Sequence, residues 1–312
     1  MTEAAIRAVG LGKSFGGAAA IRGLDLEVEK GTVAGIVGPD GAGKSTLLRL
    51  LIGLLEADRG RVEIAGFDLG RDLFQIKKRI GYMPQQFSLY GDLTVAENMK
   101  FFADLYGVAA GRFAARKKDL LRFSALGSFE GRLARHLSGG MQKKLALACN
   151  LFHTPEILLL DEPTTGVDPV SRVELWRLLA ALNAGGTTIV VTTPYMDEAA
   201  RCGRVGFIHQ GRILAYDAPE GLVTRMSGEI VEVSAPLAPA LKALRGVAGL
   251  KSVRPFGEKI HVTLGAGLSG MEKIRERLEA EGVVAESLKA IPPTFEDVFI
   301  ALSERAGKEA GR

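Results

Sequence analysis

The sequence has few of the residues that form metal or disulfide frameworks: its 312 residues include two cysteines and four histidines. Cys149 and Cys202 lack the spacing of metal ligands, so we expect reduced structural thiols in a cytosolic protein. No apolar run approaches the roughly 18 residues that a membrane-spanning helix needs. The N-terminal residues also lack the basic-then-apolar pattern of a signal peptide. We therefore expect any membrane role to come through a partner.

A strong excess of one charge is also missing. The net charge is +4, and charged and apolar residues make up 24% and 47% of the chain, as in ordinary globular proteins. This balance favours a nucleic-acid binder no more than a protein that meets phosphates or anionic lipid at one face. The length allows one large domain and a small second one, with a real core.

Short apolar or β-branched runs alternate with helical patterns over the first two-thirds of the chain. Val33–Val37, Ile157–Leu160 and Thr188–Val191 are typical of strands buried on both faces of a mostly parallel sheet. Each run precedes a turn and a helical pattern, which predicts an α/β fold. From about residue 92 to 126 helices interrupt this alternation, and Thr94 with Glu97 predicts a capping box there.

The composition changes near residue 228, so we place a domain boundary at about Ser227 and expect domains 1–227 and 228–312. The second domain resembles a small β-α-β-β-α-β unit with a charged helix over MEKIRERLEAE. Its expected strands are Ile230–Ser234, Lys259–Leu264 and Val283–Leu288, and a short helix is expected around Ala240–Leu244. Near the C-terminus an apolar stripe at helical spacing, Phe295, Val298, Phe299 and Leu302, predicts packing rather than a ligand site.

The run GPDGAGKS matches the P-loop pattern G-x-x-x-x-G-K-[ST] and lies between a strand-like and a helix-like segment. Its glycines let backbone N–H groups surround a phosphate chain at a helix N-terminus. We expect Mg-ATP here, with Lys44 on the β- and γ-phosphates and the Ser45 hydroxyl on Mg²⁺. A glycine-rich turn that only joins strand to helix is the competing interpretation. The expected nucleotide-binding residues are Gly38, Pro39, Asp40, Gly41, Ala42, Gly43, Lys44, Ser45 and Thr46.

The run EILLLDEP places two acids at the carboxyl end of a buried strand, where ligand sites form in open parallel sheets. Asp161 is expected to hold Mg²⁺ through water, and Glu162 to polarise the attacking water. Paired acids after a strand are often only a helix N-terminus. Their position some 120 residues after the P-loop favours the functional interpretation.

The run LSGGMQKK supplies a second anion-accepting helix N-terminus, at Ser138, Gly139 and Gly140. A glycine hinge before a helix is the alternative. One phosphate tail does not need two such sites in one chain unless the sites face each other across a dimer.

With these three motifs in order, residues from about 5 to 225 resemble an ATP-binding-cassette (ABC) ATPase. The resemblance implies a P-loop ATPase domain with a mixed sheet core and a helical subdomain at about 88–150, followed by a small C-terminal α+β domain. It also implies that the LSGG segment of one subunit closes over the ATP held by another subunit's P-loop.

Further roles follow from the same resemblance. Phe15 matches the aromatic residue that stacks on adenine, and Gln85 matches the loop glutamine that senses Mg²⁺ and water. Asp168 matches the loop aspartate that contacts the opposite subunit. A phenylalanine can stack as well as a tyrosine, but taken alone Phe15 would more often be a core residue. Gln85, taken alone, would be any loop glutamine.

The sequence departs from the family pattern at two positions. Asp40 stands where asparagine is usual, and Pro194 stands where a histidine usually contacts the γ-phosphate. Proline offers neither a side-chain donor nor a backbone N–H, and losing one transition-state donor costs about 10²–10³ in rate. We therefore expect ATP binding with slow or partner-dependent hydrolysis, catalysed by Glu162, Lys44 and Gln85.

The segment from residue 80 to 107 and the ending PPTFEDVFIAL resemble the exporter ATPases grouped with daunorubicin-resistance pumps. Such subunits work on the cytoplasmic face of the cell membrane with separate permeases and a second cassette, without nucleic acid. The resemblance implies that a permease helix binds near Phe87, Leu89 and Tyr90, although these residues also fit a packed loop. The competing functions are a regulatory cassette that barely hydrolyses, a soluble non-transport cassette protein and, less compatible with LSGGMQ, an unrelated P-loop kinase.

Overall fold

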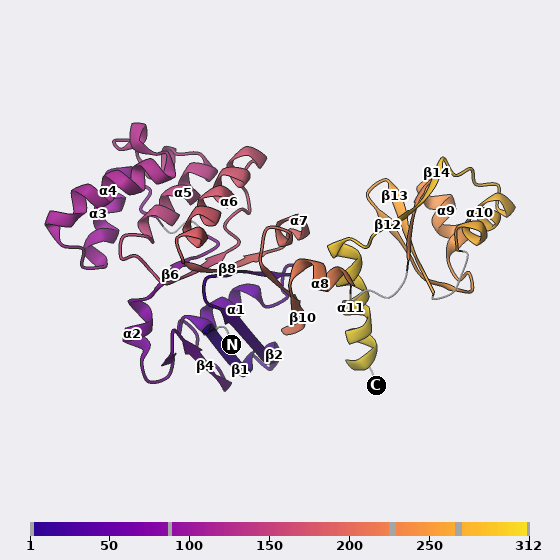
Figure 1. Cartoon of the computed structure of the whole chain (residues 1–312), viewed down its shortest axis with the longest axis horizontal. Helices are drawn as coiled ribbons and strands as arrows, with labels where there is room; N and C mark the ends of the chain where they lie inside the picture. Colours follow the sequence, from indigo (N-terminus) through magenta and orange to yellow (C-terminus); the bar gives the residue numbers. More distant parts are fainter. Residues whose placement is uncertain (1–2, 87–88, 225–228, 266–269, 311–312) are drawn as a thin grey trace. The chain divides into compact units, whose positions relative to one another are not determined.

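The computed structural model of the chain describes residues 3–86, 89–224, 229–265 and 270–310 (Figure 1). Its contacts divide the chain into two units, Met1–Pro219 and Glu220–Arg312. The boundary that the sequence suggests, near Ser227, falls outside the described residues, and the division of contacts comes before it.

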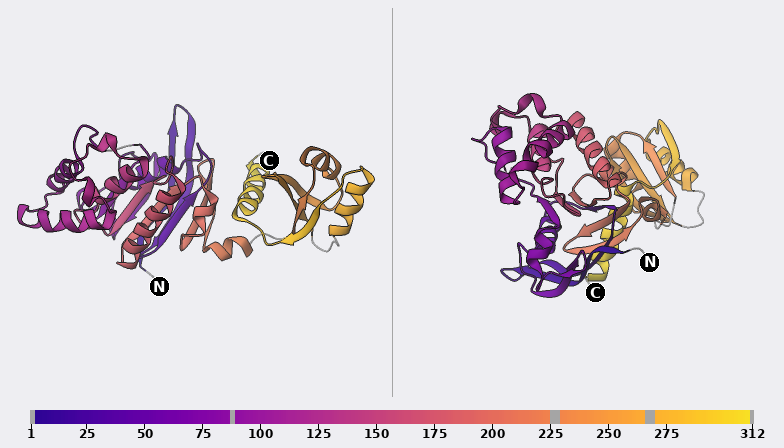
Figure 2. Two further views of the ribbon diagram at one scale, coloured as in Figure 1. Left: turned by 90° about the horizontal axis from the view of Figure 1, so that it is seen from above. Right: turned by 60° about the vertical axis from the view of Figure 1, so that its left-hand side comes forward.

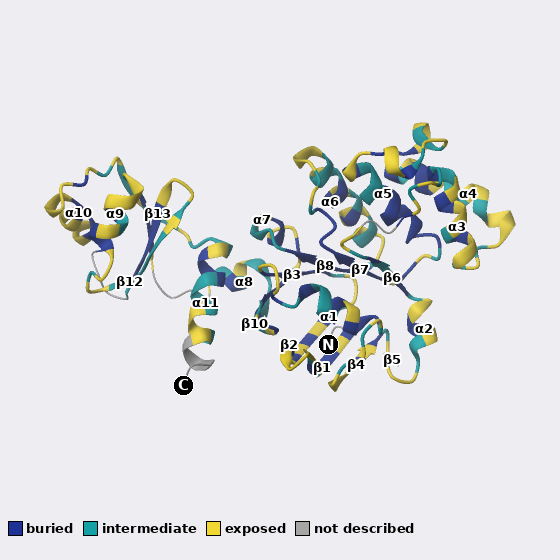
Figure 3. Cartoon of the chain, turned by 180° about the vertical axis from the view of Figure 1, so that it is seen from behind, coloured by how far each residue is buried: buried dark blue, intermediate teal, exposed yellow. Residues whose placement is uncertain are grey.

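The first unit contains a six-stranded sheet with the strand order β10-β9-β3-β8-β7-β6. Neighbouring strands from β9 to β6 are parallel, and β10 is antiparallel to β9. The strands are β3 (Val33–Val37), β6 (Ile80–Met83), β7 (Ile157–Asp161), β8 (Thr188–Thr193), β9 (Arg204–His209) and β10 (Arg212–Asp217). Every residue of β3, β7 and β8 is buried (Figure 3), because the sheet is covered on both faces.

A second, antiparallel sheet with the order β2-β1-β4-β5 lies in the same unit. Its strands are β1 (Ala4–Phe15), β2 (Ala18–Glu29), β4 (Arg59–Ile64) and β5 (Phe67–Asp68). Helix α1 (Lys44–Leu51) buries Leu47, Leu48, Leu50 and Leu51 in a core that takes side chains from both sheets. This packing fixes the start of α1 at the carboxyl end of β3.

In the sequence, most of the remaining helices of the first unit lie between β6 and β8. They are α2 (Leu73–Lys77), α3 (Val95–Leu105), α4 (Ala110–Ser124), α5 (Gly139–Cys149), α6 (Pro169–Ala184) and α7 (Met196–Ala199), with short 3-10 turns at Gly127–Phe129 and Ala134–His136, and α8 (Pro219–Thr224) begins at the border. Helices α3 and α4 contact α5, and the two views of Figure 2 show the magenta helices as one group beside the sheets. The predicted capping box of Thr94 and Glu97 opens α3.

The second unit contains a four-stranded antiparallel sheet with the order β12-β13-β11-β14. Its elements are β11 (Ile230–Ser234), α9 (Leu237–Leu244), β12 (Leu250–Phe256), β13 (Lys259–Leu264), α10 (Gly270–Ala280), β14 (Ser287–Ile291) and α11 (Phe295–Ala310). Strands β11 to β14 with their two helices follow the expected β-α-β-β-α-β order. In α11, two of the four residues of the expected apolar stripe, Val298 and Phe299, are buried, as packing requires.

One strand of this unit differs from the expectation. The sequence predicts a strand over Val283–Leu288, but β14 begins at Ser287. This residue pairs with Ser234, the last residue of β11, so the residues before Ser287 have no partner in that strand. Val284 is 78% exposed in the connection after α10. Most of the expected run is therefore a loop, and only Ser287 and Leu288 belong to β14. In the part of the chain that the structure describes, no helix has the length and apolarity to cross a bilayer.

Candidate functional site

The P-loop connects the carboxyl end of β3 to the N-terminus of α1 and is closely packed at two glycines. A Cβ atom at Gly38 would lie 2.2 Å from the carbonyl oxygen of Ile208. Gly43 has a φ of +107°, and a Cβ there would lie 2.8 Å from the carbonyl oxygen of Ala20. No side chain caps α1, so the N–H groups of its first turn are available to an anion.

Lys44 joins the P-loop to the acid pair at the end of β7. Its ammonium lies 3.0 Å from Oε1 of Glu162, and both side chains are about 95% buried. It also donates to the carbonyl oxygens of Gly38 and Pro39, at 2.9 and 3.1 Å. A phosphate that draws Lys44 away would leave the Glu162 carboxylate with its other partners.

Asp161 receives two hydroxyl donors on one oxygen. The Ser45 hydroxyl donates to Oδ1 at 3.0 Å and the Thr192 hydroxyl donates to the same atom at 2.7 Å. The second oxygen, Oδ2, is buried without a hydrogen-bond partner.

These oxygen donors fit Mg²⁺, which prefers one or two carboxylates together with phosphates and waters over an all-protein cage. Among the residues that the structure describes, no group of three or more His, Cys, Asp and Glu side chains could hold a metal without such help. The unpartnered Oδ2 of Asp161 is the kind of atom that a metal-bound water would satisfy.

Glu162 follows the last residue of β7 in a left-handed turn, with a φ of +46°. Its Oε2 accepts hydrogen bonds from Nε2 of Gln85 at 2.9 Å and from the Thr165 hydroxyl at 3.1 Å. A left-handed conformation is unfavourable for a residue with a Cβ and persists where neighbours hold it. The structure thus brings Gln85, from the loop after β6, into direct contact with the proposed catalytic carboxylate.

Lys143 of α5 is the cation that links the helical part to this site. Its ammonium donates to the backbone carbonyl oxygen of Gln85 at 2.7 Å. Burial lowers the pKa of Lys143, while the Asp161 and Glu162 carboxylates act in the opposite direction. Helix α5, which begins within the LSGG segment and is called the signature helix below, is therefore attached to the loop that carries Gln85.

The LSGG segment lies against the loop from Gly166 to Ser171, which is separate from the P-loop. Ser138 is the N-cap of α5 and accepts a hydrogen bond from the backbone N–H of Met141 at 3.3 Å. A Cβ at Gly140 would lie 2.4 Å from the Ser171 side chain, and one at Gly139 would lie 3.4 Å from the carbonyl oxygen of Gly166. Ser138 and Gly139 are exposed, as a surface that binds another molecule must be.

Asp168 caps α6 at the end of that same loop. Its Oδ1 accepts a hydrogen bond from the backbone N–H of Ser171 at 3.0 Å, which holds the pKa of the Asp168 carboxyl below its ordinary value. Asp168 is exposed and lies close to the LSGG segment in the chain fold. Part of its role is thus local, since capping alone requires an aspartate or a similar residue.

Phe15 ends β1, and its ring is 48% exposed with the Lys13 ammonium 5.7 Å from the ring centre. Core packing, the alternative interpretation, does not fit that exposure. The Phe15 backbone pairs across the hairpin with Ala18, two residues before Ala20, whose carbonyl oxygen would lie 2.8 Å from a Cβ at Gly43. An aromatic face is thus available beside the P-loop.

Asp40 points away from the buried part of the loop. Its side chain is 92% exposed, and its Oδ1 lies 3.7 Å from the Lys44 ammonium. Solvent screens a charge at such a position, so the departure from asparagine has little reason to weaken phosphate binding strongly.

Pro194 directly follows the last residue of β8. The carbonyl oxygen of the preceding residue, Thr193, accepts a hydrogen bond from the Gly38 N–H at 3.3 Å, which places this strand end beside the P-loop. The Thr193 hydroxyl donates to the buried Glu198 at 2.6 Å. Position 194 therefore adjoins the P-loop, but its side chain offers no donor.

The residues suggested for permease binding have different environments. Leu89 is 7% exposed and is therefore mainly a packing residue, whereas Tyr90 is 51% exposed. The Tyr90 ring meets Phe101 of α3 edge-on, with ring centres 4.7 Å apart. Phe87 lies outside the described residues.

Three residues at the site were missed by sequence reasoning: Thr165, Thr192 and Lys143. The first two lie in runs of paired threonines, one after the acid pair and one at the end of β8, but threonine is common in strands for reasons of packing alone. Lys143 lies one turn after Gly139, where the sequence showed only a basic helix.

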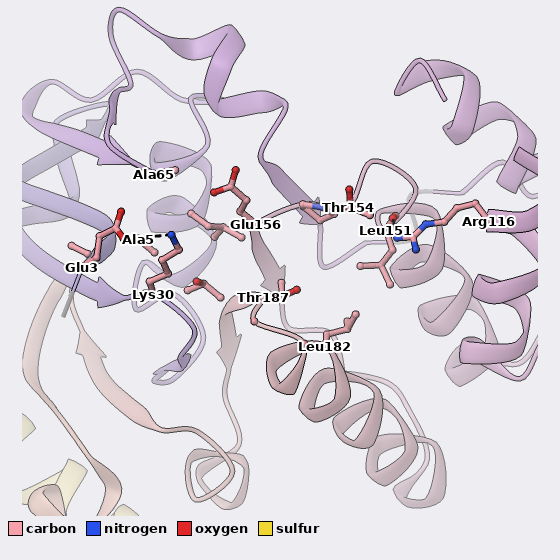
Figure 4. Close-up of a pocket in the computed structure, with 16 residues that line it drawn as sticks. Glu3, Ala5, Lys30, Ala65, Arg116, Leu151, Thr154, Glu156, Leu182 and Thr187 are labelled. Atoms are coloured by element: carbon pink, nitrogen blue, oxygen red, sulfur yellow. Dashed lines mark hydrogen bonds and ion pairs between the residues drawn. The ribbon is translucent and has the colours of Figure 1, made fainter. Parts of the chain in front are cut away.

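A separate cavity of about 400 Å³ opens at the other end of the parallel sheet (Figure 4). Its wall includes Ile157 and Thr188, the first residues of β7 and β8, together with Lys30, Glu156 and Arg116. The acids Asp161 and Glu162 lie at the opposite ends of these strands. This cavity is thus distinct from the P-loop site.

Comparison with protein-family models matches residues 21–165 to the ABC transporter family. The chain is 41% identical over 98% of its length to the probable multidrug ABC transporter ATP-binding protein YbhF of Escherichia coli, but it spans only 53% of that protein. It is 35% identical to the daunorubicin resistance ATP-binding protein DrrA3 of Streptomyces coeruleorubidus, over 99% of this chain and 100% of the relative.

Solved structures give the same result for the fold. A dimeric ATP-binding cassette in a post-hydrolysis state with ADP and Pi aligns with a TM-score of 0.63 and 27% identity, over 68% of this chain and 98% of the other. The protein cbiO1 of Clostridium perfringens aligns with a TM-score of 0.66 and 25% identity, over 71% and 91% of the two chains. The expected α/β cassette fold is confirmed.

Proposed function

The chain belongs to the family of ABC transporter ATP-binding proteins, and from this premise we propose that it is the ATP-hydrolysing subunit of an exporter. In this proposal residues 1–227 form the ATPase domain and residues 228–312 an accessory domain. The exporter's membrane permease is a separate chain, and the ATPase lies on the cytoplasmic face of the membrane through it.

The observation that carries the proposal is the cluster at the carboxyl ends of the parallel strands. Lys44, Glu162 and Gln85 form a continuous chain of contacts, at 3.0 and 2.9 Å. Ser45 contacts Asp161 beside them at 3.0 Å. These contacts support the proposal that a phosphate-binding loop, a metal-binding oxygen pair and a general base belong to one site.

In the proposed reaction the P-loop holds the phosphates, and Ser45, Asp161 (through water) and Gln85 would hold Mg²⁺. When bound, the metal would supply positive charge beside the phosphate oxygens. Lys44 leaves Glu162 for the β- and γ-phosphates, which frees a carboxylate oxygen. Glu162 then orients the attacking water and accepts its proton as the water oxygen bonds to the γ-phosphorus. The bond between the γ-phosphorus and the bridging oxygen breaks, and ADP and inorganic phosphate are the products.

The site is completed by a second cassette. Ser138, Gly139 and Gly140 of that cassette would close over the γ-phosphate, with its Asp168 loop alongside. Loss of the γ-phosphate removes these contacts and opens the pair, and the permease converts the motion into transport. If the second cassette is identical, both sites lack the histidine donor, and if it is a different chain the two sites are unequal.

The transported substrate is proposed only as a class. Relatives are described as resistance proteins for daunorubicin and linearmycin and as exporters of Nod factor. We assign this chain to the export of a drug, a lipid or a similar substrate. The exposed Tyr90 and Phe101 pair is the surface we assign to the permease.

A weakly hydrolysing regulatory cassette is the second candidate, and Pro194 is the observation that favours it. The two functions differ in how hydrolysis responds to the membrane partner. Purifying the tagged chain from membranes identifies the permease and cassette that accompany it. A transport engine hydrolyses ATP faster in that complex than alone, whereas a regulatory cassette shows the same low rate in both, and absence of any membrane protein in the purified material contradicts the exporter proposal.

A further inference from the structure

Thr192 contacts both acids of the proposed ATPase site, although its position on β8 lies 30 residues further along the chain. It pairs with Asp161 in the parallel ladder between β7 and β8 and is fully buried. Its hydroxyl donates to Oδ1 of Asp161 at 2.7 Å and accepts a hydrogen bond from the backbone N–H of Glu162 at 3.0 Å. One hydroxyl thus connects the metal-binding carboxylate with the turn that carries the general base.

The first contact fixes the rotation of the Asp161 carboxylate. Thr192 and Ser45 both donate to Oδ1, which leaves Oδ2 as the atom available to a metal-bound water. Ser45 itself is expected on Mg²⁺, so its hydroxyl cannot be relied on to hold Asp161 once the metal binds. Thr192 is then the donor that remains.

The second contact supports the unfavourable backbone of Glu162. This residue has a φ of +46°, a region that residues with a Cβ occupy only where the surroundings hold them. Its N–H is shared between the hydroxyl and the carbonyl oxygen of Thr192, at 3.0 and 3.1 Å. In this turn the carboxylate reaches Lys44, Gln85 and Thr165.

We propose that Thr192 is a positioning residue, which directs Oδ2 of Asp161 toward Mg²⁺ and holds the Glu162 carboxylate toward the attacking water. The proposal rests on the ATPase function proposed above. It assigns Thr192 no contact with nucleotide or metal. Its effect passes through Asp161 and Glu162.

The substitution that removes only the hydroxyl is Thr192→Val, which keeps the shape and the β-branched side chain. In this variant Oδ1 of Asp161 keeps its hydrogen bond from Ser45, and the Glu162 N–H keeps its hydrogen bond to the backbone carbonyl of residue 192. We therefore expect the variant to fold. Thr192→Ser restores the hydroxyl. The matched control is Thr188→Val at the other end of β8, where a similarly buried hydroxyl accepts a hydrogen bond from Gly31 N–H at 2.9 Å.

Two properties of the whole chain are measured for each variant. One is the Mg²⁺ concentration that gives half of the maximal thermal stabilisation by ADP, with ADP binding without metal measured alongside. The other is the rate of a single turnover of Mg-ATP. Groups that orient metal ligands typically contribute 10- to 100-fold, so we expect Thr192→Val to raise the required Mg²⁺ and to slow turnover by about tenfold each.

The metal-free binding of ADP should not change in Thr192→Val, and Thr192→Ser should lie within about threefold of wild type for both properties, because its hydroxyl restores both hydrogen bonds. Thr188→Val should match wild type in Mg²⁺ dependence. Equal Mg²⁺ dependence in Thr192→Val and Thr188→Val would overturn the positioning role, as would a Thr192→Ser variant no better than Thr192→Val. A wild-type chain that does not bind ADP overturns the proposed function as well, whereas normal wild-type binding and turnover with an unaffected Thr192→Val overturns this inference alone.

Discussion

At the scale of single residues, we expect Pro194 to limit the rate of ATP hydrolysis at the proposed site. It follows the strand end whose Thr193 carbonyl oxygen accepts a hydrogen bond from the Gly38 N–H of the P-loop, so a side chain at this position starts close to the P-loop. One donor to a developing negative charge contributes about 10²–10³ in rate. We predict that Pro194→His raises the single-turnover rate of ATP hydrolysis at least tenfold.

The control for this prediction is Pro194→Ala, which removes the proline ring without adding a donor. Its rate should stay close to that of wild type. If Pro194→His is no faster than Pro194→Ala, the missing histidine is not what limits hydrolysis.

Two glycines of the P-loop offer a matched pair for testing its packing. Gly41 and Gly43 both have positive φ, +75° and +107°, so alanine is unfavourable at either by about 1–2 kcal/mol. Only at Gly43 would the added Cβ also meet a backbone atom, the Ala20 carbonyl oxygen at 2.8 Å. We predict that Gly43→Ala weakens ADP binding at least about tenfold, or 1.4 kcal/mol, and that Gly41→Ala weakens it less.

Isothermal titration calorimetry with ADP would measure this difference. Similar affinities in the two variants would mean that the close packing of Gly43 against β2 does not shape the phosphate site.

The residues of this site differ in how visible they were in the sequence. Lys44, Ser45, Asp161 and Glu162 lie in short motifs whose chemistry demands those side chains at that spacing. Thr192 reaches both acids only because β7 and β8 are neighbours, and pairing between strands 30 residues apart is a tertiary property that local patterns do not reveal. Thr165 reaches Glu162 within the turn after β7, but a threonine three residues after an acid is no signal by itself.

At the scale of elements, the N-terminus of α3 depends on a reciprocal cap. The Thr94 hydroxyl accepts from the Glu97 N–H at 3.2 Å, and the Glu97 carboxylate accepts from the Thr94 N–H and hydroxyl at 2.8 Å each. Losing such a cap costs about 1 kcal/mol, which corresponds to roughly fivefold faster local opening. We predict that Thr94→Ala speeds amide hydrogen exchange in α3 by about that factor at neutral pH, and leaves α6 unchanged.

The same cap predicts a dependence on pH. Hydrogen bonds from the Thr94 N–H and hydroxyl lower the pKa of Glu97 below its ordinary value. The carboxylate therefore stabilises the fold fully above the unfolded pKa of about 4.3, and this contribution is lost as the pH falls through the lower folded value. The exchange difference between wild type and Thr94→Ala should shrink in acid, and a constant difference from neutral pH to below pH 4 contradicts this.

Elements were predictable where one local signal was strong. The strand β3 has the bounds that its apolar pattern indicates, and the helix α3 begins directly after Thr94, as its cap indicates. In the second unit β12 was not identified and β14 was expected too early, because pairing with β13 and β11 sets their limits. The sequence LKSVRPF contains a proline and three polar residues, which obscure a strand pattern.

At the scale of the whole molecule, the residues proposed for ATP hydrolysis and the LSGG segment proposed to bind a second cassette lie in separate places of the first unit. Gln85, attached through Lys143 to the signature helix, contacts the Glu162 carboxylate. A movement of α5 is therefore expected to shift Gln85 and, through it, the Glu162 carboxylate that we propose activates water. The LSGG segment, by contrast, presents exposed residues whose proposed target lies on a second cassette.

The central claim is that the P-loop and the acid pair form one ATP-cleaving site with Glu162 as its base. The most direct test measures ATP binding and single-turnover phosphate release on the same whole-chain preparations of wild type and Glu162→Gln. We predict that Glu162→Gln binds Mg-ATP at least as tightly, because Lys44 loses its ion pair with Glu162, and releases phosphate about 10²-fold more slowly. Equal rates of release in the two proteins, or no binding of Mg-ATP by wild type, would contradict the account.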